Sequence, residues 1–183
     1  MKFDAIVLAG GGGARLGGVD KAELVVGGTR LLDTVLRSLV DAENIIVVGP
    51  RRGSEADVEW LRESPPGGGP VAGIAAGLAA VSAAAVAVAA VDHPGVTTAT
   101  WSKLLAELTL TDPDGALVTD GEGRDQPLVA IYRTAALERA VAGLDPHGAS
   151  VAALVEGLTL TRVADPVAAR DIDTPADLSG AAG

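Results

Sequence analysis

Four consecutive glycines, Gly10 to Gly13, lie in the segment Leu8 to Lys21, which also carries the cations Arg15 and Lys21. Glycines lack Cβ atoms and expose their backbone N–H groups, which makes a concave site for anions. Arg15 can clamp oxygen atoms with two hydrogen bonds, and Lys21 adds a mobile point charge. The segment therefore predicts a loop that binds phosphate groups. A flexible glycine-rich turn with two surface cations is the alternative.

The spacing of the glycines excludes two better-known phosphate-binding loops. A P-loop requires Lys directly after the second glycine of its GxxxxG spacing, but Gly12 and Gly17 are followed by Gly18. The dinucleotide fingerprint requires glycines in first, third and sixth place. Counting from Gly10 puts Arg15 in sixth place, and counting from Gly11 puts Leu16 there. If the segment binds phosphate groups, it therefore does so as neither of these two loops.

Carboxylates form two further groups that could do chemistry. Asp92 directly follows the apolar run 85–91, and Asp171 and Asp173 alternate near the end of the sequence. Mg²⁺ takes one or two carboxylates together with phosphate oxygens, so Asp92 suits that ion. On an extended segment Asp171 and Asp173 point to one side, and one of them could join Asp92 at the metal. Turn chemistry at Asp92 and capping of a helix around Asp177 are equally good explanations.

Strands that alternate with helices must position these groups. Residues 3–9 form a run that is apolar apart from Asp4, typical of a strand buried on both faces, and residues 31–40 carry a helical apolar stripe. Further strands are predicted at residues 44–49, 85–91, 115–119, 128–132 and 158–163, and further helices at residues 54–62, 70–82, 98–108, 134–142 and 149–156. This alternation predicts an α/β fold, a doubly wound, mostly parallel sheet with helices on both faces. Ligands collect at the carboxyl ends of such strands, where the glycine loop and the two carboxylate groups would converge.

The composition limits the classes of function. The chain has 183 residues, 48% of them hydrophobic, and shows no internal repeat or linker, which predicts a single domain over residues 1–183. The net charge of −10 argues against nucleic acid as a partner and requires a local cluster of cations for any polyanionic substrate. The absence of cysteine excludes disulfides, a thiolate metal site and a cysteine nucleophile.

The uncharged segment 65–91 is long enough to span a bilayer. It is dominated by Ala and Gly, which insert weakly, and Pro and Gly interrupt it, so a buried helix followed by a buried strand explains it better. Met1 to Asp4 carries an acid and leads directly into the first apolar run, unlike a basic-then-apolar signal peptide. We therefore expect a cytoplasmic protein with no membrane partner; the sequence does not predict its oligomeric state.

Several segments together resemble the molybdenum cofactor guanylyltransferases (MobA-like NTP transferases). The segment Leu8-Ala9-Gly10-Gly11, with Arg15, Gly17 and Asp20-Lys21, is similar to the family signature LAGGxSxRMGxDK. Further matches follow in the expected order at residues 69–73, at Asp92 within Val-Asp-His-Pro, at residues 126–130 and at residues 171–175. The resemblance spans nearly the whole chain. It implies a Rossmann-like nucleotidyltransferase fold and transfer of GMP from GTP to molybdopterin-bound molybdenum, with Mg²⁺.

The resemblance also implies roles for individual residues. Arg15, Lys21 and Asp92 would be catalytic, with Lys21 on the triphosphate and Asp92 on Mg²⁺, which Asp173 could also bind. The implied nucleotide-binding residues are Leu8, Ala9, Gly10, Gly11, Gly12, Gly13, Arg15, Lys21, Gly49, Glu63 and Asp92.

Some positions depart from the family pattern. Glu63 stands where the family often has an aspartate that contacts the base, and Asp173 stands where these enzymes tend to have Asn. Gly49 replaces an Asn whose side chain touches the nucleoside, so that contact is lost or comes from the backbone. Gly10 favours GTP, because relatives that use CTP typically read LAAG.

The acceptor remains open at this level, because the predicted helix 149–156 lacks the arginines expected near an anionic molybdopterin. Two alternatives stand beside the guanylyltransferase. One is an NTP transferase with another base or acceptor, of the cytidylyltransferase or sugar-phosphate type. The other is a non-catalytic nucleotide-binding relative.

Overall fold

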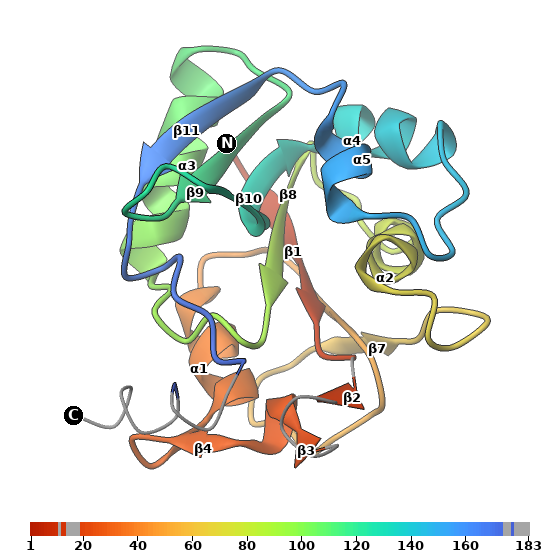
Figure 1. The fold of residues 1–183 in the computed structure, drawn as a ribbon, viewed down its shortest axis with the longest axis vertical. Coiled ribbons are helices and arrows are strands. Elements are labelled where there is room, and N and C mark those ends of the chain that lie inside the picture. Colours follow the sequence, from red (N-terminus) through yellow and green to blue (C-terminus); the bar gives the residue numbers. More distant parts are fainter. Residues whose placement is uncertain (11, 14–18, 174–176, 178–183) are drawn as a thin grey trace.

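The computed structural model describes residues 1–10, 12–13, 19–173 and 177, and a seven-stranded sheet forms its centre (Figure 1). The strands lie in the order β11-β9-β10-β8-β1-β6-β7. Only β10 runs antiparallel to its neighbours, and the other adjacent pairs are parallel. The strands are β1 (Phe3–Leu8), β6 (Ile45–Val48), β7 (Glu59–Leu61), β8 (Ala85–Ala90), β9 (Gly115–Thr119), β10 (Asp125–Arg133) and β11 (Leu160–Ala164). The mostly parallel sheet expected from the sequence is confirmed.

Helices cover both faces of the sheet, as a doubly wound fold requires (Figure 1). Phe3, Ala5 and Val7 of β1 pack toward α1 and α3, whereas Ile6 and Leu8 pack toward α2, α4 and α5. All six residues of β1 are buried, which explains why this strand is apolar at every position except Asp4. The helices are α1 (Leu31–Ser38), α2 (Pro70–Leu78), α3 (Thr98–Leu110), α4 (Thr134–Ala142) and α5 (Val151–Val155).

One carboxylate lies inside this apolar strand. Asp4 is fully buried and accepts hydrogen bonds from the N–H groups of Ser82 (2.7 Å) and Ala83 (2.9 Å) and from Nδ2 of Asn44 (2.9 Å). Burial raises the pKa of Asp4, but these hydrogen bonds outweigh that effect and hold the pKa below its ordinary value of 3.8. Asp4 thereby ties two connections to the amino end of β1.

The helix predicted at residues 54–62 is wrong. Residues 59–61 instead form strand β7, which pairs in parallel with β6 at the edge of the sheet. Ser54 makes a local turn, because its Oγ accepts from the N–H of Ala56 (3.1 Å) rather than capping a helix. The half-buried Trp60 packs on the core from β7. Pairing with β6 therefore overrides the local helix signal.

The uncharged segment 65–91 forms a loop, helix α2 and strand β8, as the sequence favours. Two glycines of α2 face β1: a Cβ at Gly73 would lie 2.9 Å from Leu8, and one at Gly77 would lie 2.8 Å from Ile6. Glycine thus lets the helix approach the sheet closely. In the part of the chain that the structure describes, no helix has the length and apolar character needed to cross a membrane.

Two short ribbons, which the sequence did not reveal, flank the turn that carries Lys21. Strand β2 (Gly12–Gly13) pairs antiparallel with β3 (Val19–Asp20), and β4 (Val25–Val26) pairs with β5 (Thr29–Arg30). Between them lies the 3₁₀ turn η2 (Lys21–Glu23). The first ribbon therefore closes the glycine loop directly before Lys21.

Candidate functional site

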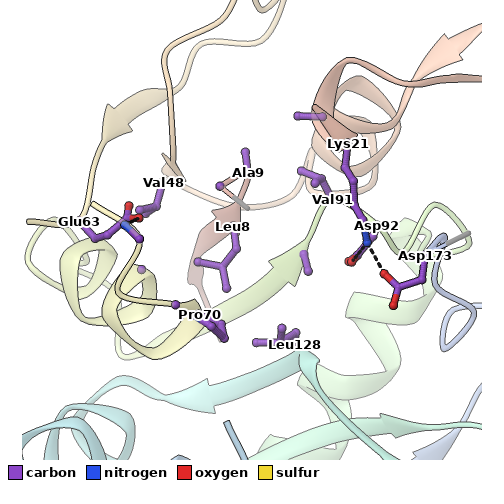
Figure 2. Close-up of a pocket in the computed structure, with 16 residues that line it drawn as sticks. Leu8, Ala9, Lys21, Val48, Glu63, Pro70, Val91, Asp92, Leu128 and Asp173 are labelled. Atoms are coloured by element: carbon purple, nitrogen blue, oxygen red, sulfur yellow. Dashed lines mark hydrogen bonds and ion pairs between the residues drawn. The ribbon is translucent and has the colours of Figure 1, made fainter. Parts of the chain in front are cut away.

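A cavity of about 530 Å³, here called the main cavity, lies at the carboxyl ends of β1, β6 and β8 (Figure 2). The chain leaves β1 for β6 through α1 on one face and returns to β8 through α2 on the other, so the cavity sits where the winding changes direction. Ligands bind at this position in open α/β sheets. The described residues that line it are Leu8, Ala9, Gly10, Lys21, Ala22, Val48, Glu63, Gly67, Gly69, Pro70, Gly73, Ala90, Val91, Asp92, Leu128 and Asp173.

Lys21, Asp92 and Asp173 meet on one side of the main cavity (Figure 2). Lys21 Nζ lies 3.1 Å from Asp92 Oδ2 and also donates to Asp173 Oδ1, although these partners are 71 and 152 positions away in the sequence. The lysine side chain is 17% exposed, and the carboxylates are 25% and 33% exposed. The convergence expected at the carboxyl ends of the strands is therefore present for these three residues.

The Lys21 ammonium stays charged in this setting. Burial by itself lowers the pKa of Lys21, but the hydrogen bond to Asp173 and the charge of Asp92 outweigh it, so the pKa lies above the ordinary value of 10.5. Lys21 is thus a permanent cation that faces the cavity at neutral pH.

One carboxylate oxygen of Asp92, Oδ1, is buried without a hydrogen bond from the described residues. The nearest His93 nitrogen, Nε2, is 3.9 Å away from it. A buried carboxylate oxygen without a donor is costly, and a cation would satisfy it. Asp92 and Asp173 already enclose one cation, the ammonium of Lys21, so this donor set fits Mg²⁺.

The protein would supply only part of the coordination of such an ion. Within the described residues no group of three or more His, Cys, Asp or Glu side chains is arranged to hold a metal. Mg²⁺ keeps several waters and often shares one or two carboxylates with substrate phosphates. The site therefore suits a metal that arrives with a polyphosphate.

Glu63 lines the opposite side of the main cavity (Figure 2). Its Oε1 accepts the N–H of Gly67 at 3.0 Å, which fixes it against the loop before α2. The apolar side chains of Leu8, Val48 and Leu128 line the space between Glu63 and the Lys21 side. The cavity thus has an acidic end, an apolar middle and an end with a paired cation.

Comparison with known proteins now identifies the family. Residues 5–167 match the family model described as the MobA-like NTP transferase domain. The chain belongs to this family. The resemblance of its signature segments to these enzymes is therefore confirmed.

Individual relatives match this MobA-like NTP transferase in sequence over nearly the whole length of both chains. The chain is 30% identical over 190 residues to a molybdenum cofactor guanylyltransferase of Cereibacter sphaeroides, covering 99% of this chain and 96% of that protein. It is 32% identical over 188 residues to a probable molybdenum cofactor guanylyltransferase of Deinococcus radiodurans, covering 100% and 95%. The crystal structure of molybdopterin-guanine dinucleotide biosynthesis protein A from Archaeoglobus fulgidus superposes with a TM-score of 0.75 at 25% identity, covering 98% and 96%. The expected nucleotidyltransferase fold is confirmed.

The glycine loop of this MobA-like transferase is described only in part. Leu8, Ala9 and Gly10 line the main cavity, and their contact with the nucleotide, which the resemblance implies, stays a prediction. Gly12 and Gly13 form β2, and neither belongs to the described lining. Gly11 and Arg15 lie outside the described residues, so their contacts with nucleotide stay predictions.

Gly49 has no room for a side chain. Its φ of 152° suits glycine, and a Cβ there would lie 2.8 Å from the carbonyl carbon and oxygen of Ala9. Its N–H donates to the carbonyl of Leu61 at 2.9 Å, and Gly49 is not part of the described cavity lining. The N–H of Gly49 is therefore already used and does not supply the backbone contact to the nucleoside.

Asp171 and Asp173 do not share one cavity, although the sequence suggested that they point to one side. Asp173 lines the main cavity, whereas Asp171 lines a separate hollow of about 360 Å³ beside Arg124. Residues 171–173 are not part of a strand, so the alternation of side chains does not apply. The N–H of the buried Ile172 donates to the carbonyl of Asp92 at 2.8 Å, which brings Asp173 close to Asp92.

Other residues of the site were missed at the level of sequence. Pro70 and Gly69 lie in a segment that matches the family, yet nothing local assigned them to the cavity wall. Leu128 lines the cavity at an irregular part of β10, where the pairing with β9 shifts between Gln126 and Ala130. Such irregularities re-aim side chains and are common beside active sites. No local signal marks them.

Proposed function

We propose that this protein is a molybdenum cofactor guanylyltransferase, which transfers GMP from GTP to a molybdopterin-type acceptor. Full-length relatives that carry this name support the proposal. The observation that carries it is the position of Lys21, a permanent cation held between Asp92 and Asp173 in the main cavity beside the glycine segment. A cation among carboxylates at the end of a nucleotide-sized cavity suits a triphosphate and its metal.

The proposed reaction is a nucleotidyl transfer. An oxygen of the acceptor phosphate bonds to the α-phosphorus of GTP, the bond from that phosphorus to the bridging oxygen breaks, and pyrophosphate leaves with the electron pair. This chemistry needs positioning and charge neutralisation more than covalent help. No general base is required, because a phosphate acceptor is already ionised at pH 7.

Each residue of the cation end has a part in this proposal. The glycine N–H groups and Arg15 hold the β- and γ-phosphates, and Lys21 donates to oxygens near the α-phosphorus, where charge grows in the transition state. Asp92 and Asp173 would hold Mg²⁺, which supplies further neutralisation of the triphosphate when bound. Asp92 Oδ1, buried without a partner among the described residues, supports this assignment.

The acidic end of the cavity supports guanine as the base. A carboxylate only accepts hydrogen bonds, so Glu63 matches a base edge that presents donors. Guanine offers adjacent N–H groups on its ring and its amino substituent. We therefore assign Glu63 to the base, because it lies on the opposite side of the main cavity from Lys21, across the apolar middle (Figure 2).

A panel of nucleotides and acceptors tests the proposed function. The protein is incubated with GTP, ATP, CTP or UTP, Mg²⁺, and either molybdopterin or a sugar phosphate, and the release of pyrophosphate is followed. Release with GTP and molybdopterin alone is expected. Turnover with CTP or a sugar phosphate would instead support the alternative transferases, and nucleotide binding without turnover would support a non-catalytic relative.

We also propose that residues 1–183 form one domain, because one large sheet takes its strands from residues 3 to 164. A single cooperative unfolding transition would support this, and two separate transitions would contradict it. The cytoplasmic location expected from the sequence stays a prediction.

A further inference from the structure

Two arginines outside the described cavity lining hold the carboxylates on either side of Lys21. Asp20 precedes Lys21 and pairs with Arg52, and Glu23 closes the turn η2 and pairs with Arg30. Lys21 itself donates to Asp92 in the main cavity (Figure 2). The turn that carries the lysine is therefore anchored by charged groups that do not face the cavity.

The pairing of Arg52 with Asp20 has the closer geometry. Nε and Nη2 of Arg52 lie 2.7 Å and 2.6 Å from the same oxygen of Asp20, Oδ2, and Nη1 donates to the carbonyl of Pro50 at 2.8 Å. The Arg52 side chain is only 9% exposed, whereas surface arginines usually keep the guanidinium in water. Two charge-assisted hydrogen bonds from one guanidinium to one carboxylate fix the geometry of the pair as well as adding to its attraction.

Asp20 uses both of its oxygens structurally. Oδ2 faces Arg52, and Oδ1 accepts the backbone N–H of Ala22 at 3.1 Å, which caps the turn η2. Arg52 therefore connects the loop after β6 with the turn that begins at Lys21. Because β6 belongs to the central sheet, this contact links the backbone at Lys21 to the sheet.

Arg30 secures the other end of the same turn. Its Nη1 donates to Glu23 Oε1 at 3.1 Å, its Nη2 donates to the carbonyl of Gly53 at 2.8 Å, and its Nε donates to Asp33 Oδ2 at 2.7 Å. Arg30 thus bridges the turn η2 and the loop 50–53, which is a second link beside the pair of Arg52 with Asp20. A turn of three residues has few internal hydrogen bonds and depends on such external contacts.

We propose that Arg52 is a positioning residue for the triphosphate, acting through Asp20 to hold Lys21 where its ammonium meets the nucleotide. This inference rests on the proposed function. If the turn η2 were not held, nucleotide binding would have to order its backbone, and that loss of conformational entropy would weaken the affinity. Fixing the backbone at Lys21 spares part of that loss during binding, so Arg52 contributes to nucleotide affinity without touching the nucleotide.

A double-mutant cycle tests whether Arg52 acts through Lys21. The affinity for GTP with Mg²⁺ is measured by calorimetry for the wild type, Arg52→Ala, Lys21→Met and the double variant. We expect Arg52→Ala to weaken binding about tenfold in the wild-type background and less than twofold in the Lys21→Met background, the coupling typical of residues that act together. An equal loss in both backgrounds would overturn the inference, because it would indicate a general structural role.

Two further variants sharpen this test. Arg133→Ala is the matched control, since Arg133 is also partly buried and donates to the carbonyls of Pro113 and Leu108, but at the opposite end of the sheet. Its GTP affinity should equal that of the wild type. Arg52→Lys keeps the charge but cannot form the same set of hydrogen bonds. Its GTP affinity should therefore lie between that of the wild type and that of Arg52→Ala.

The design also separates the failure of this inference from the failure of the proposed function. If Arg52→Ala does not fold, Asp20→Asn replaces it in the cycle, because Asn keeps an oxygen for Ala22 and loses the charge that faces Arg52. A wild type that binds GTP and an Arg52 variant of equal affinity overturn only the positioning role. A wild type that does not bind GTP overturns the proposed function, and the inference with it.

Discussion

Replacing Lys21 with Met is expected to change catalysis and metal binding in opposite directions. Met retains much of the length of the side chain but removes the ammonium that lies between Asp92 and Asp173. If the ammonium stabilises charge near the α-phosphorus, its loss raises the barrier for transfer. The same loss leaves two carboxylates without their cation, which should make them better ligands for a divalent metal.

The size of both effects follows from the contacts. Removing one preorganised donor to a developing charge typically costs about 3–4 kcal/mol, or a fall in kcat of about 10²–10³. At 3.1 Å and an effective dielectric of 20, the attraction of Lys21 to Asp92 is about 5 kcal/mol. Desolvation and the partial exposure of these side chains offset most of it, so we expect metal affinity to rise about tenfold, or ~1–2 kcal/mol.

Two assays measure these effects separately. Pyrophosphate release from saturating GTP and molybdopterin gives kcat, and binding of Mn²⁺ to the nucleotide-free protein, followed by electron paramagnetic resonance, gives metal affinity. Lys103→Met makes the same substitution at an exposed position of α3 and should leave both values unchanged. A Lys21→Met enzyme within threefold of the wild-type kcat, or one with weaker Mn²⁺ binding, would refute the reasoning.

Other variants test the metal, the buried carboxylate and the close approach of β1 and β6. Asp92→Asn should abolish Mg²⁺-dependent pyrophosphate release while circular dichroism shows an intact fold; an unchanged metal titration would mean that Asp92 only shapes a turn. Because the pKa of Asp4 is lowered on folding, the unfolded state binds its proton more readily, so the free energy of unfolding should fall as pH drops below about 4. Urea unfolding between pH 3 and 7 measures this, and Asp4→Asn should flatten the slope. Gly49→Ala should cost about 2–4 kcal/mol of stability, because its Cβ meets the backbone of Ala9 at 2.8 Å, and a melting temperature equal to the wild type would contradict this.

Local sequence patterns were sufficient for most helices and strands. Strand β9 and helix α4 begin and end at the predicted residues, 115–119 and 134–142, and β1, α1 and β8 differ by one or two residues at one end. Hydrophobic periodicity and turn residues are properties of neighbours in the chain, so they can be read without the fold. The exception at residues 54–62 was decided by pairing with β6, which no local pattern contains.

The phosphate-binding segment was the strongest local signal, and the structure changed how it is understood. The glycines and Lys21 are close in sequence, which predicted an anion site. The structure places the lysine on a separate turn, η2, after a short ribbon, and anchors that turn through Arg52 and Asp20. Arg52 lies 32 positions from Asp20, and nothing in its own neighbourhood marks it.

The sequence by itself determined which chemical groups this protein has: a glycine run with a lysine, a carboxylate after a buried strand, and a pair of carboxylates near the end. Only the tertiary structure decided that Lys21 lies between Asp92 and Asp173, that Asp171 lines another hollow, and that Gly49 leaves no room for a side chain. The physical reason is the separation of these residues in the sequence: Asp92 lies 71 positions after Lys21, and Asp173 lies 152 positions after it. The distance between such residues depends on how the strands pair and how the helices cross the sheet, which are properties of the whole fold.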